Sequence, residues 1–281
     1  MHVASLHRFP VKGLAGESLD AVDLASGAGV PDDRRFAILR GDTAFDPASP
    51  RWVAKEKCVM LVRDHALARL RLGYDPATCA LALSAPGVAP LETSLATGDG
   101  RARAAEYVAR IAEPKGGPPR IVEAGAMSFT DVPENCISIV GQASIDALSA
   151  AAGHDLHPMR FRANVYLAGG APFAEFGWIG REVALGGVVV RPFARIPRCA
   201  ATSVNPDTAQ RDLTVPKALK QHFGHVDMGV YAEVVRAGRV SVGDTVHPPA
   251  DTRAGGAGWL ASTLRTIRLY LRQGLVLARR R

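Results

Sequence analysis

The chain has 281 residues, of which 47% are hydrophobic and 22% are charged, an ordinary composition for a globular protein. This length can bury one large or two medium cores, and we favour two domains. Aromatic residues make up only 6%, too few for a base-stacking surface, and no nucleic-acid motif is present, so we expect no nucleic-acid partner. No apolar block is long enough for a signal peptide or a spanning helix, which favours a cytoplasmic protein.

The first half of the chain alternates polar and apolar residues as β-strands do. The alternation predicts strands at 3–8, 19–24, 36–39, 58–63 and 80–83. We expect the first three to form an antiparallel meander. Apolar residues at helical spacing then predict a helix over 101–113, and a Pro/Gly cluster at 114–119 is the candidate domain boundary.

The second half continues with short strand patterns, predicted at 137–140, 161–167, 182–185, 187–192, 231–236, 240–242 and 245–247. Short helices at 142–151 and 216–222 interrupt them, and Gly224 is placed to cap the second helix. Many short strands with glycine turns indicate a small barrel.

The net charge of +7 is concentrated in the last part of the chain. From Asp251 onward there are seven arginines and a single acidic residue. Apolar residues in this tail share one helical face: Leu260, Leu264, Ile267, Leu271 and Leu275. We predict a basic amphipathic helix that is a candidate contact for an acidic protein or for the surface of a membrane at its periphery. A solvated helix packed on its own domain is an equally good interpretation.

Together these patterns predict a mainly β fold in three parts. They are an N-terminal β-barrel-like domain at 1–118, a β-barrel domain with short helices at 119–249, and the basic C-terminal helix and tail at 250–281.

The four cysteines are Cys58, Cys79, Cys136 and Cys199. They are separated by 21, 57 and 63 positions, which matches no zinc or iron-sulfur motif. A cytoplasmic protein needs no disulfide framework, so we expect free thiols, with buried packing as the default for the first three.

Cys199 has the setting of a reactive thiol. It follows a buried-looking strand and lies beside Arg198 and close to Arg195, and positive neighbours favour the thiolate, which is both a soft metal ligand and a nucleophile. From the residues alone, a half-buried structural cysteine is at least as good an interpretation.

Residues 198–208 resemble the signature R-C-x-x-T-x-V-x-P-x-T of the MOSC family, the molybdenum cofactor sulfurase C-terminal domain. Residues 160–164 are similar to its R-F-R-x-N segment, and 240–246 to its closing V-x-V-G-D-x-V. In the first half, 10–12 and 33–36 are similar to the P-V-K and D-R-x-F elements of the MOSC N-terminal β-barrel domain. The resemblance covers about residues 1–248 and implies that both predicted domains have MOSC folds.

The resemblance implies that Cys199 is the catalytic residue and the metal ligand, binding molybdenum held by a pterin dithiolene. It also implies the residues that bind this molybdenum cofactor: Lys12, Arg34, Ser128, Thr130, Asp131, Arg160, Arg162, Asn164 and Arg198. The cations suit an anionic cofactor, and surface ion pairs are the alternative interpretation for each. Gly13 and Pro197 depart from the family, which often has serine at these two positions, and each loses a hydroxyl donor.

Family members with this two-domain layout include the amidoxime-reducing components. The resemblance therefore implies a molybdenum-dependent oxidoreductase that reduces N-hydroxylated or related small molecules by two-electron oxygen-atom transfer. Because the tail contains no cysteine for a cluster, an external electron-donor protein is expected. The alternative, from another class, is a sulfur or cofactor carrier that uses a Cys199 persulfide, supplied by a partner because no pyridoxal-phosphate desulfurase domain is present. A third hypothesis is a family member that has lost the cofactor.

Overall fold

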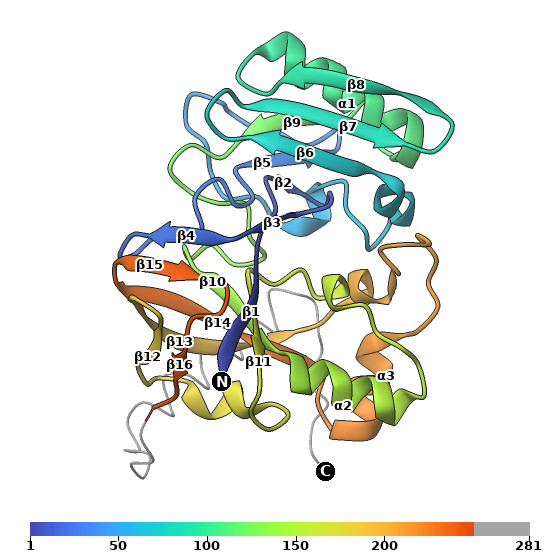
Figure 1. Ribbon diagram of the computed structural model, residues 1–281. Coiled ribbons are helices and arrows are strands. Elements are labelled where there is room, and N and C mark those ends of the chain that lie inside the picture. The colour runs from blue at the N-terminus through green and yellow to red at the C-terminus, as the bar shows by residue number, and fades with distance from the viewer. Residues whose placement is uncertain (250–281) are drawn as a thin grey trace.

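The computed structural model describes residues 1–249, and the predicted basic helix and tail at 250–281 lie outside the described residues. Within 1–249 there are sixteen strands and three α-helices, which confirms the mainly β prediction. Figure 1 shows an upper part built mostly from the first half of the chain and a lower part built mostly from the second half.

The lower part is organised around one eight-stranded sheet. In spatial order its strands are β16 (Val246–His247), β12 (Val183–Leu185), β13 (Val188–Pro197), β14 (Asp227–Arg236), β10 (Ile137–Gly141), β11 (Val165–Ala168), β1 (His2–Arg8) and β3 (Glu17–Leu19). All neighbours are antiparallel except β10 and β11. The valines and isoleucines along these strands pack into the largest buried cluster of this part, as expected for β-branched residues on a pleated surface.

Strand β13 is irregular where it pairs with β14, up to its C-terminal end. Its register shifts at three places, and the last shift lies between Arg195 and Pro197. Bulges re-aim side chains and bend a strand. This one directly precedes Cys199, which then caps the short 3-10 helix η5 (Ala200–Ser203).

Two helices cover the lower sheet beside β10 and β11 (Figure 1). They are α2 (Gln142–Ala152) and α3 (Val215–Phe223), and both end at a glycine in the left-handed conformation, Gly153 and Gly224. Left-handed backbone at a helix end favours glycine because it has no Cβ. The predicted cap at Gly224 is confirmed.

The upper part contains two three-stranded sheets and one long helix. The strands are β2 (Val11–Lys12), β5 (Phe36–Leu39) and β9 (Arg120–Glu123) in one sheet, and β6 (Arg71–Asp75), β7 (Ala80–Ala85) and β8 (Val88–Ser94) in the other. Helix α1 (Gly98–Ala112) begins where the Thr97 hydroxyl accepts a hydrogen bond from the Gly100 N–H, and its buried face packs into the same core as both sheets.

Several strands connect the two parts. β1 and β3, from the start of the chain, lie at the edge of the lower sheet, and β4 (Ala21–Leu24) pairs with β15 (Gly238–Ser241). β9 follows the Pro/Gly cluster at 114–119 yet pairs with β5 in the upper part. The division at residue 118 stays a prediction. The pairings show that each part contains strands from both sides of this residue.

Three predictions about local structure are wrong. The first strands form only the first pairing of the predicted meander, β1 antiparallel with β3, because β4 pairs with β15 and β5 pairs with β2 and β9. Residues 58–63 are not a strand: Cys58 makes one isolated bridge, and the chain then turns where the Asp64 carboxylate accepts the Met60 N–H. The strand at 161–167 begins only at Val165, because Arg162 has a left-handed φ of 50°.

None of the helices that the structure describes within 1–249 is long and apolar enough to cross a membrane.

Candidate functional site

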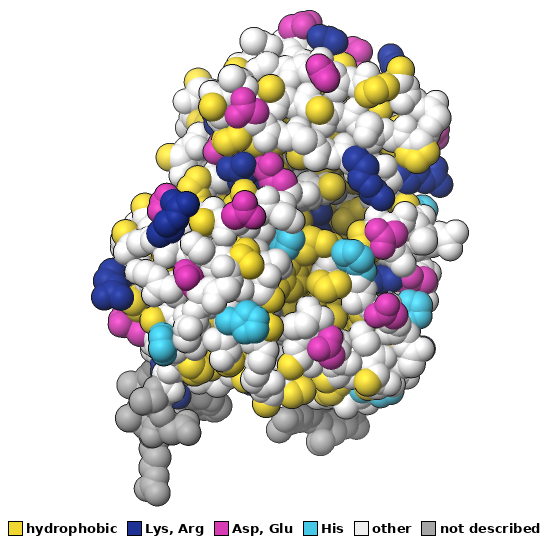
Figure 2. Space-filling model, in the orientation of Figure 1, with side chains coloured by type: hydrophobic (Ala, Val, Ile, Leu, Met, Phe, Trp, Pro, Cys, Tyr) yellow, Lys and Arg dark blue, Asp and Glu magenta, His cyan; other side chains and the backbone are white. Residues whose placement is uncertain are grey.

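The predicted site residues surround one cavity at the junction of the upper and lower parts. The space there is about 850 Å³ when the open solvent at its mouth is included. Figure 2 shows the surface hollowed at this junction, with lysine and arginine side chains at its edge. Nine of the ten residues named from the sequence line the cavity: Lys12, Arg34, Thr130, Asp131, Arg160, Arg162, Asn164, Arg198 and Cys199.

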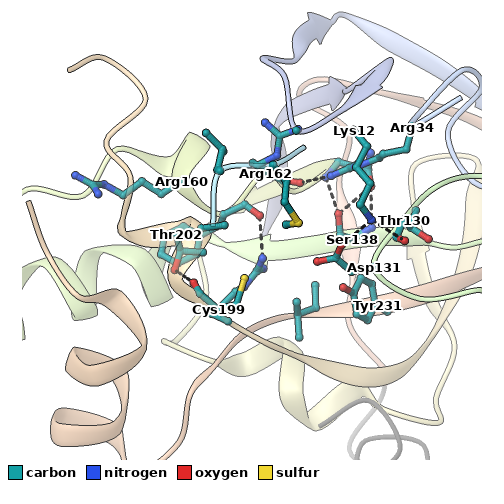
Figure 3. Close-up of a pocket in the computed structure, with 18 of the residues that line it drawn as sticks. Lys12, Arg34, Thr130, Asp131, Ser138, Arg160, Arg162, Cys199, Thr202 and Tyr231 are labelled. Atoms are coloured by element: carbon teal, nitrogen blue, oxygen red, sulfur yellow. Dashed lines mark hydrogen bonds and ion pairs between the residues drawn. The ribbon is translucent and has the colours of Figure 1, made fainter. Parts of the chain in front are cut away.

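Cys199 lies at the lower edge of this cavity (Figure 3). Its thiol is free and half-buried, whereas the other three cysteines are buried. The Thr202 hydroxyl donates to the Cys199 carbonyl at 2.8 Å, which fixes the turn of η5 that carries the thiol. Burial raises the pKa of Cys58 to about 11 and that of Cys136 well above its ordinary value, so both stay protonated thiols.

The Arg198 guanidinium is hydrogen-bonded to backbone carbonyls through all three of its nitrogens. Its Nε and Nη2 donate to the Met228 carbonyl, and its Nη1 donates to the Phe161 carbonyl at 2.8 Å. These bonds tie the Cys199 loop to β14 and to the segment before β11. Burial lowers the pKa of Arg198, and the three bonds show that its first role is to hold backbone.

Arg160 is also occupied by the protein. Its Nη2 donates to both oxygens of the Asp212 carboxylate at 2.6 Å, and its Nη1 donates to the Ser203 carbonyl. In Figure 3 its guanidinium points away from the other labelled side chains. Of its nitrogens, only the buried Nε has no partner among the described residues.

Lys12 fixes the loop that lies opposite Cys199. Its ammonium donates to the carbonyls of Phe129 and Thr130 and to the Asp131 carboxylate, at 2.8–3.1 Å. An ammonium has three donors, so these three acceptors use all of them. Burial acts to raise the pKa of Asp131, but the charges of Lys12, Lys55 and Arg34 and the hydrogen bond from Lys12 together outweigh it and hold that pKa well below its ordinary range.

Arg34 and Arg162 form a pair on the junction side of the cavity. Both guanidinium groups lie over the ring of Phe9, at 4.4 and 4.5 Å from its centre. Arg34 donates to Asp33 and to the Arg162 carbonyl, whereas the Arg162 side chain has no hydrogen-bond or ion-pair partner among residues 1–249. Burial, and then the charge of Arg34, lower the pKa of Arg162 to about 9. The Arg162 guanidinium therefore makes no direct ion pair among residues 1–249, although the carboxylates of Asp33 and Asp131 act on it through space.

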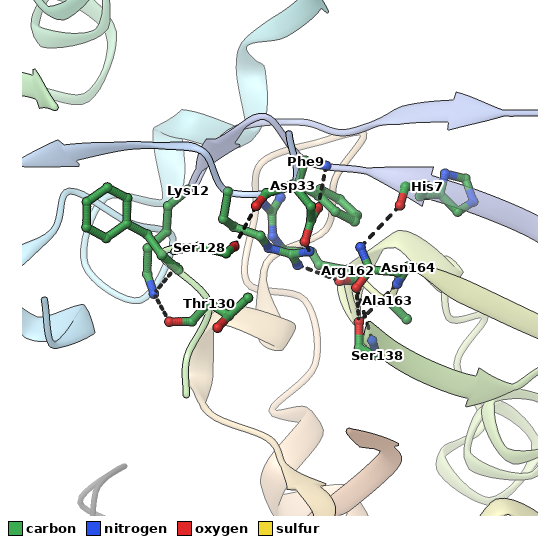
Figure 4. Close-up of polar contacts among 12 residues, drawn as sticks. His7, Phe9, Lys12, Asp33, Ser128, Thr130, Ser138, Arg162, Ala163 and Asn164 are labelled. Carbon is green, nitrogen blue, oxygen red and sulfur yellow. Dashed lines mark hydrogen bonds and ion pairs between the residues drawn. The ribbon is translucent and has the colours of Figure 1, made fainter. Parts of the chain in front are cut away.

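The backbone of this pair is strained. Arg34 and Arg162 both have a φ of 50°, in the left-handed region that costs a side chain with a Cβ about 1–3 kcal/mol. The surroundings enforce the strain: the Arg34 N–H donates to the Phe9 carbonyl, and the Asp33 carboxylate accepts the Phe9 N–H. Figure 4 shows the Asp33 carboxylate bonded to the Phe9 N–H, with Arg162 close by. Such strain is typical of functional sites.

Asn164 and Ser128 do different work from the cations. The Asn164 amide oxygen accepts from the Ser138 N–H and hydroxyl, and its amide nitrogen donates to the His7 carbonyl, which joins β1, β10 and β11 (Figure 4). The Ser128 hydroxyl donates to the Asp33 carbonyl at 2.5 Å. Ser128 is the one predicted cofactor contact that does not line the cavity, and it supports the Arg34 turn instead.

Family models match both halves of the chain. The MOSC N-terminal beta barrel domain matches residues 1–113, and the MOSC domain matches residues 126–247. The chain belongs to the MOSC family.

Curated relatives of this MOSC chain are amidoxime reducing components. It is 27% identical over 123 residues to the mitochondrial amidoxime reducing component 2 of Bos taurus, which is 40% of this chain and 36% of that protein. It is 28% identical over 128 residues to component 2 of Homo sapiens, 41% of this chain and 38% of that protein. The chain thus spans well under half the length of the curated relatives it matches.

Two solved structures are similar to this MOSC chain. The YUAD protein of Bacillus subtilis aligns with a TM-score of 0.42 and 15% identity, covering 87% of this chain and 92% of that one. YiiM of Geobacillus stearothermophilus aligns with a TM-score of 0.35 and 18% identity, covering 48% and 63%.

The two departures from the MOSC pattern have different structural settings. Gly13 has a φ of 92°, and a Cβ there would lie 2.9 Å from the Val59 carbonyl oxygen, so the chain has closed over the space that a serine side chain needs. Pro197 ends β13, pairs in register with Asp227 and lines the cavity beside Ile196. This wall of the MOSC cavity is apolar where a serine would be polar.

Three site residues escaped the sequence analysis. Phe9 directly precedes the P-V-K element, and its hydrophobicity alone predicted only burial. Ser138 and Tyr231 line the cavity from two different strands, and they are direct partners in the pairing of β10 with β14. No local motif marks that pair, because only the sheet brings the two strands together.

The residues of the cavity fit an anionic pterin that carries molybdenum. The unpaired Arg162 offers charge to a phosphate, and Cys199 offers a thiol to a metal. Within residues 1–249 there is no group of three histidine, cysteine or acidic side chains that could hold a metal ion unaided. A metal at Cys199 would therefore depend on ligands that a cofactor brings with it.

Proposed function

We propose that this MOSC chain is a molybdenum-cofactor-dependent oxidoreductase that removes oxygen from N-hydroxylated or related small molecules. One observation carries the proposal: a half-buried free thiol, Cys199, shares a cavity with a strained arginine, Arg162, whose side chain makes no direct hydrogen bond or ion pair within residues 1–249. A half-buried cation that faces a cavity with its donors unused offers them to a ligand, so its position points to an anionic ligand.

The chain's own residues would hold the cofactor from two sides. Arg162 and Arg34 attract the pterin phosphate, with Arg162 offering the donors that no protein group uses. Cys199 would hold the metal through its sulfur. Lys12, Arg160 and Arg198 would support the cofactor indirectly. Their donors are used to hold the loops that form the walls of the cavity.

Two other side chains in the cavity have fixed protonation states. Asp131 stays ionised because Lys12 lowers its pKa, so it accepts hydrogen bonds from the N–H groups of a pterin. Tyr231 stays protonated because burial raises its pKa well above the ordinary value, so it offers an O–H donor to the ligand.

The reaction needs two electrons and two protons. An amidoxime would lose its N-hydroxyl oxygen as water and leave an amidine, and the cofactor, when bound, would supply the two-electron redox chemistry. The electrons come from an external one-electron donor protein. The basic segment after residue 250 is the candidate docking site for that donor or for anionic lipid.

Elemental mass spectrometry tests the proposal on protein purified from a host that makes the cofactor. We expect close to one molybdenum per chain in the wild type and a loss of at least roughly tenfold in Arg162→Met, since the variant removes the cation whose donors are unused. Arg236→Met, an exposed arginine on β14, is the matched control and should keep its molybdenum. A wild type without molybdenum in that host would refute the proposal and leave a family member without cofactor.

A second candidate is a sulfur carrier, favoured by the half-buried position of the free Cys199 thiol beside open space. Intact-protein mass spectrometry separates the two. A persulfide on Cys199 that disappears in Cys199→Ala, in protein without stoichiometric molybdenum, supports the carrier. An unmodified cysteine in a molybdenum-loaded chain supports the enzyme.

A further inference from the structure

A second cavity adjoins the one that contains Cys199. It encloses about 710 Å³ and shares part of its wall with the first cavity. The shared residues are Gly13, Leu61, Arg160, Arg162 and Ala201. Ala201 lies two positions after Cys199 on η5, so the two spaces meet close to the thiol.

The wall of the second cavity is mostly apolar. Phe9, Leu67 and Leu70 come from the upper part, and Met159 and Val204 come from the lower part. Its charged residues other than the shared arginines are Arg71 and Asp207, both exposed. An apolar interior with polar groups at the rim is typical of a site for an uncharged, ring-sized group.

Two arginines fix the passage between the cavities. Arg211 donates to the carbonyls of Leu61, Val62 and Ala200, which holds the 61–62 turn against η5. Arg71 donates to the carbonyls of Ala68 and Pro206 on the two sides of the second cavity. Both walls of the space are therefore tied across the junction without a ligand, which lowers the cost of binding one.

The second cavity does not suit the cofactor itself. A phosphate or an ionised pterin edge would leave water for apolar side chains, which costs several kcal/mol per charge without a partner. Arg160 cannot supply that partner, because Asp212 and Ser203 already occupy its terminal nitrogens. Arg162 borders both cavities, but Arg34 and Lys12 line only the first, so an anion bound there has more positive charge around it. The anionic cofactor therefore suits the first cavity, and the second cavity suits an uncharged group.

We propose that the second cavity binds the apolar body of the substrate, while the N-hydroxylated head passes Ala201 and Leu61 to reach the Cys199 side of the first cavity. This inference rests on the proposed function. It assigns the chain to amidoximes or similar compounds with an aromatic or branched aliphatic body, in preference to small polar oxidants. Two electrons and two protons convert the amidoxime to an amidine and water, with a one-electron donor supplying the electrons.

The test compares two substrates with the same reacting head. Benzamidoxime carries a phenyl ring and acetamidoxime a methyl group, and dithionite-reduced methyl viologen serves as donor. Ala68→Trp, on η2 (His65–Arg69), fills the cavity from the upper wall. Ala66→Trp, on the same short helix but outside the cavity lining, is the matched control. Met159→Trp fills the space from the lower wall and serves if Ala68→Trp does not fold.

Burying a phenyl ring contributes about 2 kcal/mol, so blocking its site should raise the KM for benzamidoxime at least roughly tenfold. The KM for acetamidoxime should change by less than about twofold in the same variant. Calorimetric binding of benzamidine, the product, gives a readout that needs no turnover and should weaken by the same factor. The control variant should match the wild type in both measurements.

Equal effects on the two amidoximes, or unchanged benzamidine binding in both filling variants, would overturn the assignment. Molybdenum content is measured on every sample. If the wild type contains molybdenum and reduces benzamidoxime, and the filling variants keep the wild-type KM for benzamidoxime, this inference alone is refuted. A wild type without molybdenum refutes the proposed function first.

Discussion

The arginines around the cavity divide into two groups that sequence alone does not separate. On the Cys199 side, Arg160 and Arg198 use their terminal nitrogens to hold the chain. On the junction side, Arg162 has no partner within 1–249, and Arg34 keeps part of its fork free beside it. All four lie in family motifs. An arginine in a family motif can therefore have one of two roles. It can hold the backbone that forms the cavity wall, as a wall-building arginine, or it can face the ligand, and the hydrogen bonds of its side chain show which role it has.

Strain separates the two groups as well. Arg34 and Arg162 have left-handed backbone, whereas Arg160 and Arg198 do not. The wall-building arginines should therefore matter for stability, and the ligand-facing pair should matter for binding at a cost to stability. Substitutions in each group can break or sharpen this division.

The largest effect is expected at Arg198. Arg198→Met removes three hydrogen bonds and leaves the buried Met228 and Phe161 carbonyls without this donor, so the free energy of unfolding should fall by ~3 kcal/mol. Urea unfolding followed by circular dichroism measures it, with Arg236→Met on the exposed end of β14 as the control. A loss no larger than that of the control would mean that Arg198 does not build the wall.

The next largest effect on stability is expected at Gly13, which lines the cavity. Gly13→Ser restores the hydroxyl that the family often has, but at a φ of 92° and with a Cβ 2.9 Å from the Val59 carbonyl oxygen. We expect a loss of about 2 kcal/mol in stability from strain and crowding. Gly27→Ser, at a φ of 72° with open space around the Cβ, isolates the backbone strain and should lose less. Equal losses would show that the contact with Val59 has no cost.

Local patterns predicted the parts of the fold that depend on neighbours in sequence. Helices α1, α2 and α3 and strands such as β5 and β10 fall within a few residues of the expected ranges. The predicted meander failed because the pairing of β1 with β11 and of β4 with β15 depends on segments more than 100 positions away. No alternation of side chains encodes such a partner.

The same limit applies to the site. Motifs gathered nine cavity-lining residues, but they could not show that three acceptors occupy Lys12 or that Asp212 occupies Arg160. Phe9, Ser138 and Tyr231 carry no motif of their own. Their role follows from packing under two guanidinium groups and from a pairing across strands, which only the folded chain displays.

A smaller effect of opposite sign is expected at Arg162. Arg162→Gly relieves the left-handed backbone and removes a half-buried cation that makes no direct ion pair, so the protein without cofactor should gain about 1 kcal/mol in stability. The same variant should lose its molybdenum. Thermal unfolding of cofactor-free protein, beside metal analysis of loaded protein, measures both. A variant that is clearly less stable without cofactor would place Arg162 among the wall-building arginines.

The smallest effect concerns Asp212 and depends on pH. Burial acts to raise the pKa of Asp212, but the hydrogen bonds from Arg160 and Asn205 and the charge of Arg160 together outweigh it and lower the pKa from 3.8 to about 2. Because the folded value is the lower one, the contribution of Asp212 to stability is present above about pH 4 and is lost as the pH falls through 2. Asp212→Asn should therefore lose less stability than the wild type between neutral pH and about pH 3 in urea unfolding.

Asp207→Asn, an exposed carboxylate on the same loop, is the control for this pH series. The Asp212 variant also decides how far the division between the two groups of arginines holds. Its side chain is partly exposed, so the stability effect near neutral pH should stay below about 1 kcal/mol, and molybdenum content should not change. If Asp212→Asn lost molybdenum as Arg162→Met is expected to, Arg160 would be turning toward the ligand, and wall and ligand site would share one set of cations.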